Sequence, residues 1–175
     1  MVKQPPAPLP VLGAATDARE DLCRRCGVSC HFAVPVNGLP VVIDELRCRY
    51  LLRAEDGRFA CSVYPQRYQV APWCHSAEDA LLKGLQAQDC PYGRGAPSAD
   101  PAAPRVRGKT RLSPSLLHKV LPAILAEIQR VGVPSGADPA PVQALLERST
   151  PADEAPVRWT YALSEDGQRY LFHRA

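Results

Sequence analysis

Seven cysteines confined to one stretch are the feature that most limits how this chain can fold. All of them lie between Cys23 and Cys90, in the order C-x2-C-x3-C followed by four single cysteines. Thiolates that converge from a compact, turn-rich region are typical ligands of zinc and of iron–sulfur clusters. An odd number of cysteines argues against a fully paired disulfide framework. The pattern therefore predicts a metal-binding region.

The triplet Cys23, Cys26 and Cys30 is the strongest part of this pattern. A two-residue gap lets the chain turn back, so that two thiolates face one ion, and Gly27 suits such a turn because glycine tolerates positive φ. A continuous helix would place the triplet on one face. Gly27 instead favours a helix that ends in a knuckle. We expect all three cysteines to be metal ligands.

The compartment matters because thiols stay reduced in the cytoplasm. Residues 1–20 contain Lys3, but the apolar run at 11–15 is too short for the core of a signal peptide. No stretch approaches the length of a membrane span. We therefore expect a cytoplasmic protein that contacts no membrane and uses its clustered cysteines to bind metal.

Turn and cap signals predict an α+β fold made of short elements. Nineteen prolines argue against long uninterrupted elements. Hairpin turns are predicted at Asn37-Gly38, Asp56-Gly57 and Asp166-Gly167. Helices are predicted to begin at Ser76, Ser113-Pro114 and Asp138-Pro139. The second hairpin would bring Cys48 and Cys61 toward each other, so that two single cysteines can complete a site begun by the triplet.

Apolar residues at helical spacing mark the buried face of each predicted helix. The first helix carries Leu81, Leu82 and Leu85. The second carries a stripe from Leu116 to Ile128 that Pro122 should kink and Gly132 should end. The third carries Val142, Leu145 and Leu146. We expect these faces to form core, with the long stripe as a candidate docking face.

Composition divides the chain into four parts. We expect a flexible N-terminal arm at 1–15, a loop-rich, metal-stabilised cysteine-cluster domain at 16–95, a linker at 96–112, and C-terminal helices and a hairpin at 113–175. The linker is rich in Pro, Ala and Ser. Its later basic residues are Arg105, Arg107, Lys109 and Arg111. We expect them to form a solvated connector and no nucleic-acid contact.

A longer pattern runs through the cysteine region. It consists of Cys23, Cys26, Gly27, Cys30, Asp44, Cys48, Cys61, Tyr64, Arg67 and Cys74. This order resembles the YkgJ-type cysteine-cluster family, a zinc- or iron-chelating domain with the pattern C-x-x-C-G-x-C-C, an acidic residue and a cysteine, C-x-x-Y-x-x-R-P, and a final cysteine. Ser29 stands where the family has a further cysteine, and residues 68–71 are inserted after Arg67. The resemblance ends near His75.

The predicted metal ligands combine the triplet with the pattern, and they are Cys23, Cys26, Cys30, Cys48, Cys61 and Cys74. Cys90 and His75 stay open as further ligands. Adjacent residues usually point apart, so His75 and His31 are expected at the surface or behind the ligands. Tyr64 and Arg67 are equally consistent with a role in the site and with packing. Trp73 is expected to be a lid over the metal.

The main functional hypothesis is a metal-binding protein that holds zinc or an iron–sulfur cluster. Six thiolates exceed one tetrahedral site, so either some are spare or two metals share bridging sulfurs. Two alternatives remain open. One is a redox, methyl-transfer or maturation enzyme that uses the cluster, although no catalytic residue is singled out. The other is a zinc-stabilised interaction adaptor whose Leu116–Ile128 helix binds a protein partner.

Overall fold

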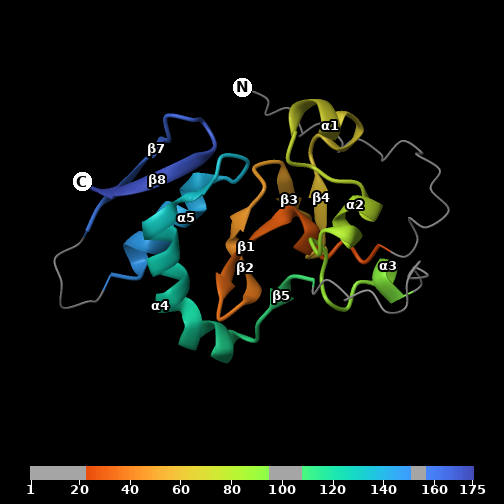
Figure 1. Ribbon diagram of the computed structural model, residues 1–175, viewed down its shortest axis with the longest axis horizontal. Coiled ribbons are helices and arrows are strands. Elements are labelled where there is room, and N and C mark those ends of the chain that lie inside the picture. Colours follow the sequence, from red (N-terminus) through yellow and green to blue (C-terminus); the bar gives the residue numbers. More distant parts are fainter. Residues whose placement is uncertain (1–22, 95–107, 151–156) are drawn as a thin grey trace, which may run out of the picture.

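The computed structural model describes residues 23–94, 108–150 and 157–175. The predicted arm at 1–15 and most of the predicted linker lie outside these ranges. The α+β class is confirmed, with hairpins followed by a helical segment and a terminal hairpin (Figure 1). None of the helices in the described ranges combines the length and apolar character needed to span a bilayer.

The first sheet forms the centre of the molecule. A 3₁₀ turn at Val28–Cys30 leads into β1 (His31–Val36), which pairs antiparallel with β2 (Leu39–Arg47). Asn37 and Gly38 have φ values of 50° and 76°, the two positive values that a type I′ turn requires. The predicted first hairpin is therefore confirmed. β5 (Thr110–Arg111) adds a short parallel strand on the other edge of β2.

The second hairpin and the short helices lie on one side of this sheet (Figure 1). β3 (Leu51–Arg53) pairs with β4 (Phe59–Cys61), which confirms the hairpin predicted at Asp56-Gly57. The helices that follow are α1 (Arg67–Val70), α2 (Ala77–Leu82) and α3 (Pro91–Arg94). The Ser76 hydroxyl caps α2 by accepting from the Asp79 N–H at 3.0 Å. The apolar face predicted for this helix is wrong at Leu82, which is 69% exposed, because the short helix buries Ala80 instead.

The C-terminal elements lie on the other side of the first sheet (Figure 1). They are α4 (Pro114–Val131), β6 (Val133–Pro134), α5 (Pro139–Arg148), β7 (Trp159–Leu163) and β8 (Arg169–Arg174). The strands form a sheet in the order β6-β8-β7, with the predicted terminal hairpin between β7 and β8. Pro114 begins α4 as predicted, but the Ser113 side chain makes no capping hydrogen bond. Gly132, with φ of 68°, ends the helix.

One hydrophobic core joins the first sheet to the C-terminal elements. Val34, Ile43 and Leu46 of β1 and β2 pack with Ile124 and Ile128 of α4. The residues predicted for the buried face of α5 are all in this core, namely Val142, Leu145 and Leu146. The opposite side of the sheet, away from α4 and α5, carries the cysteine-bearing turns (Figure 1).

Candidate functional site

Four cysteines from four separate segments line one cavity of about 220 Å³, which we call the thiol cavity. Cys30 ends the 3₁₀ turn, Cys48 follows β2, Cys61 ends β4, and Cys74 follows α1. All four are free and only partly exposed. The backbone draws these segments together, since the Cys48 N–H donates to the Cys30 carbonyl at 2.8 Å and Leu51 pairs with Cys61 across β3 and β4.

Burial favours the protonated form of three of these thiols, Cys30, Cys61 and Cys74. It raises the pKa of Cys30 to about 12, and the neighbouring thiols Cys48, Cys74 and Cys61 raise this pKa further, because thiolates repel one another. Burial also raises the pKa of Cys61 and of Cys74, while the Arg67 guanidinium opposes part of both shifts. The cavity therefore needs a cation before several of its thiols can ionise together.

The four sulfurs line the same cavity, but they are not placed around a common position that a metal ion could occupy. Within residues 23–94, 108–150 and 157–175, no three side chains of His, Cys, Asp or Glu are placed so that they could hold a metal ion. Their chemistry nevertheless suits a thiophilic metal, because soft thiolate ligands select zinc, copper(I) and iron–sulfur clusters. Metal binding here would require the sulfurs to move closer together.

Trp73 forms one wall of the thiol cavity. Its indole Nε1–H donates to the Cys48 sulfur at 3.3 Å. The ring lies against Gly136, where a Cβ atom would come within 2.5 Å of it, and is parallel to the Tyr50 ring at a centroid distance of 6.2 Å. Trp73 thus connects the cavity to the loop after β6, and its predicted role as a lid over a metal stays a prediction.

Two cationic side chains also line the thiol cavity, Arg67 and Lys109. The Arg67 guanidinium lies 3.9 Å from the Tyr64 ring centroid and 4.3 Å from that of Tyr68. Arg67 therefore both packs and faces the thiols. Lys109 belongs to the predicted solvated connector, and that prediction is wrong here because Lys109 is only 6% exposed. The sequence pattern at Gly108-Lys109-Thr110 gives no signal of this burial.

The two histidines nearest the cysteines differ in environment. His31 is 1% exposed and lines the thiol cavity, so of its two predicted positions the surface is excluded and a place behind the cysteines stays a prediction. Its Nδ1 lies 2.8 Å from the Gly27 carbonyl, and burial lowers its pKa. Its buried Nε2 has no hydrogen-bond partner in the described part of the chain. His75 lines the thiol cavity, and its Nδ1 lies 3.3 Å from Lys83 Nζ. Whether His75 is a ligand stays open.

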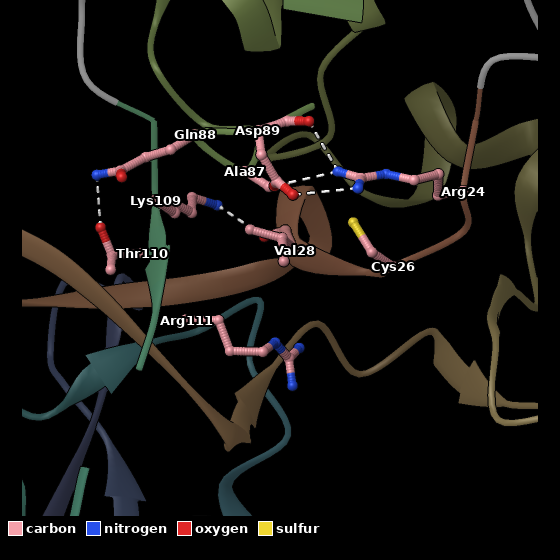
Figure 2. A pocket seen from close by; sticks show the side chains of 9 residues that line it. All are labelled: Arg24, Cys26, Val28, Ala87, Gln88, Asp89, Lys109, Thr110 and Arg111. Carbon is pink, nitrogen blue, oxygen red and sulfur yellow. Dashed lines mark hydrogen bonds and ion pairs between the residues drawn. The ribbon is translucent and has the colours of Figure 1, made fainter. Parts of the chain in front are cut away.

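The remaining cysteines lie away from the thiol cavity. Cys23 and Cys26 are exposed. Figure 2 shows Cys26 in a second hollow of about 440 Å³, the outer cavity, beside the ion pair of Arg24 and Asp89. Cys90 lines neither of these two cavities. The structure thus separates Cys26 from Cys30, and joint ligation by the triplet stays a prediction.

No family model, curated protein or solved structure matches this chain.

Proposed function

We propose that this chain binds a thiophilic metal, zinc or an iron–sulfur cluster, through Cys30, Cys48, Cys61 and Cys74. The observation that carries the proposal is that free thiols from four separate segments line one cavity. A buried cysteine by itself is an ordinary small apolar residue. Four of them around one hollow can bind a soft cation as thiolates. The arginine and the lysine that also line the hollow would offset the negative charge that remains.

The proposed role of the metal is to stabilise the cysteine-bearing side of the molecule. The elements there are short, and β3, β4 and α1 contain 3, 3 and 4 residues. Segments this short bury little apolar surface and gain most from a cross-link. Free energy of metal binding becomes free energy of folding when the unfolded chain has no preformed site. A bound metal would supply positive charge that favours ionised thiols, and the chain would supply the four sulfurs.

Whether Cys23 and Cys26 also bind the metal distinguishes a four-thiolate site from a six-thiolate site. The resemblance to the YkgJ-type family extends the proposed ligands to Cys23 and Cys26, and it stays a proposal, as does the cytoplasmic location that favours reduced thiols. The exposure of both residues favours the four-thiolate site. The adaptor alternative has less support, because Ile124 and Ile128 of the proposed docking stripe are buried in the core.

Metal analysis of anaerobically purified protein, with its visible absorption spectrum, tests the proposal. The spectrum distinguishes an iron–sulfur cluster from colourless zinc. We expect wild type to retain metal and Cys48→Ser to lose it, because Cys48 contributes a sulfur and receives the Trp73 N–H. Cys90→Ser is the matched control and should retain metal. A metal-free wild type, or full retention in Cys48→Ser, would overturn the proposal. Loss in Cys26→Ser would add Cys26 to the ligands and contradict a site made of the four cavity thiols alone.

A further inference from the structure

Lys109 stands between the two cavities and lines both. Its backbone belongs to the segment before β5, where its N–H donates to the Gln86 carbonyl at 2.7 Å. Gly108 allows this close approach, because a Cβ atom there would lie 2.5 Å from the same carbonyl oxygen. Figure 2 shows the side chain extending from this anchor toward Val28. Lys109 therefore connects the segment after α2 to the turn that carries Cys30.

The ammonium group of Lys109 is enclosed by carbonyl oxygens of that turn. Its Nζ donates to the carbonyls of His31 at 2.5 Å, Ser29 at 3.1 Å and Val28 at 3.5 Å. These contacts account for the three donors that an ammonium group carries. Because Cys30 lies between two of the accepting residues, the contacts fix the part of the backbone from which its thiol enters the cavity.

Burying a charged lysine side chain costs desolvation free energy, unless hydrogen bonds or an opposite charge compensate it. Lys109 is 6% exposed, and removing an ammonium group from water is unfavourable without compensation. Methionine would fill a similar volume without that cost. The carbonyl contacts compensate part of the cost, and a thiolate at Cys30 would attract the ammonium group further. A four-thiolate site with a divalent metal retains excess negative charge, which a nearby fixed cation offsets.

We propose that Lys109 is a positioning residue of the thiol site: it orients the Val28–Cys30 turn so that Cys30 faces the cavity, and it offsets the negative charge of the metal-bound thiolates. This inference rests on the proposed function. Lys109 lies outside the segment that resembles the YkgJ-type family, so the residue belongs to the site through the fold alone.

Metal affinity tests this role in the full chain. Zinc affinity is measured by competition with a chromophoric chelator, and the number of bound thiolates by the charge-transfer absorption of the cobalt(II) form. The variants are Lys109→Met, Lys109→Arg and the control Lys119→Met, whose side chain is exposed on α4. Loss of a group that orients a metal ligand typically weakens affinity by about 10–100-fold, and we expect this loss for Lys109→Met together with a reduced cobalt–thiolate band. Lys109→Arg keeps the charge and should bind more tightly than Lys109→Met, while Lys119→Met should equal wild type.

A purely structural role for Lys109 predicts a different result. It would lower the free energy of unfolding but leave the affinity and cobalt spectrum of folded protein unchanged. Circular dichroism defines the folded fraction of each variant. If folded Lys109→Met binds zinc within about threefold of wild type, the inference fails and the metal site stands. If Lys109→Met does not fold, Lys109→Gln decides, because glutamine keeps hydrogen-bond donors but not the charge. A loss of about tenfold or more in the zinc affinity of the folded variant supports the inference, and binding within about threefold of wild type contradicts it. Absence of metal binding in wild type itself removes the proposed function and this inference together.

Discussion

Gly27 is the residue that separates the cysteines of the triplet. It adopts φ of 72°, a left-handed conformation that is unfavourable for residues with a Cβ atom, and it directs the chain into the turn that carries Cys30. A Cβ atom at this position would lie 2.7 Å from the Phe59 ring. Cys26 and Cys30 therefore face different cavities although only three residues lie between them.

Substitution of Gly27 by alanine should combine two costs. The positive φ costs about 1–2 kcal/mol for a residue with a side chain. The contact with Phe59 adds about 1–3 kcal/mol, because the ring must move. Gly57→Ala is the matched control, since Gly57 has φ of 77° with no atom within 4 Å of an added Cβ. Urea unfolding should show that Gly27→Ala loses more stability than Gly57→Ala. Equal losses would mean that the Phe59 contact is unimportant.

The sequence predicts single-residue features where the cause is local. Asn37-Gly38 and Gly27 all adopt positive φ, and their residue types alone are enough to indicate it. The burial of Lys109 has no such local cause, because its partners, the carbonyls of Val28, Ser29 and His31, are 78–81 residues away. The close packing of Phe59 against Gly27 could not be predicted either, because the two residues are far apart in the sequence.

At the scale of elements, the terminal hairpin shows how one turn can be stabilised by a carboxylate. The Ser164 hydroxyl donates to Asp166 Oδ1 at 2.6 Å, and the Gln168 N–H donates to the same oxygen at 3.0 Å. Gly167 supplies the positive φ of 70°. These bonds favour the ionised carboxylate, so they hold the pKa of Asp166 below its ordinary value, the Ser164 hydroxyl having the largest effect.

A lowered pKa in the folded state makes the contribution of Asp166 depend on pH. The contribution is fully present above the ordinary pKa of an aspartate, about 4, and is lost as pH falls through the lower folded value. We expect unfolding free energy to decrease less steeply below about pH 4 in Asp166→Asn than in wild type, because asparagine keeps an acceptor oxygen but does not titrate. Thermal melts from neutral to acidic pH measure the two curves. Parallel curves would contradict the role of Asp166.

Elements with strong local signals could be predicted, and their packing could not. The starts of α2, α4 and α5 follow from Ser76, Pro114 and Pro139. The exposure of Leu82 does not follow, because tertiary packing buries Ala80 of the same helix instead. β5 could not be predicted, because a two-residue strand depends on its partner β2 rather than on its own sequence.

At the scale of the whole molecule, the core connects parts that the sequence predicts as separate domains. Residues of β1 and β2, within 16–95, share one cluster with residues of α4, α5 and β8, within 113–175. The Arg49 side chain makes a second connection, with its guanidinium carbon 5.8 Å from the ring centroids of both Trp73 and Tyr170. The predicted domain boundaries stay untested, and cooperativity of unfolding can decide them.

We expect the two halves to unfold together, because Ile128 of α4 is buried in the shared core. Ile128→Ala should reduce the free energy of unfolding by about 2–5 kcal/mol. The measurement uses a Trp159→Phe background, in which Trp73 is the single indole. In this background Ile128→Ala should lower the urea midpoints of two transitions, the loss of helical circular dichroism and the change in Trp73 fluorescence, and the two midpoints should stay equal. Leu116→Ala is the control, since Leu116 on the same helix is 50% exposed and should change stability by no more than about 0.5 kcal/mol. A fluorescence transition that stays at the wild-type midpoint while the circular dichroism transition moves would show that 16–95 and 113–175 fold as independent units.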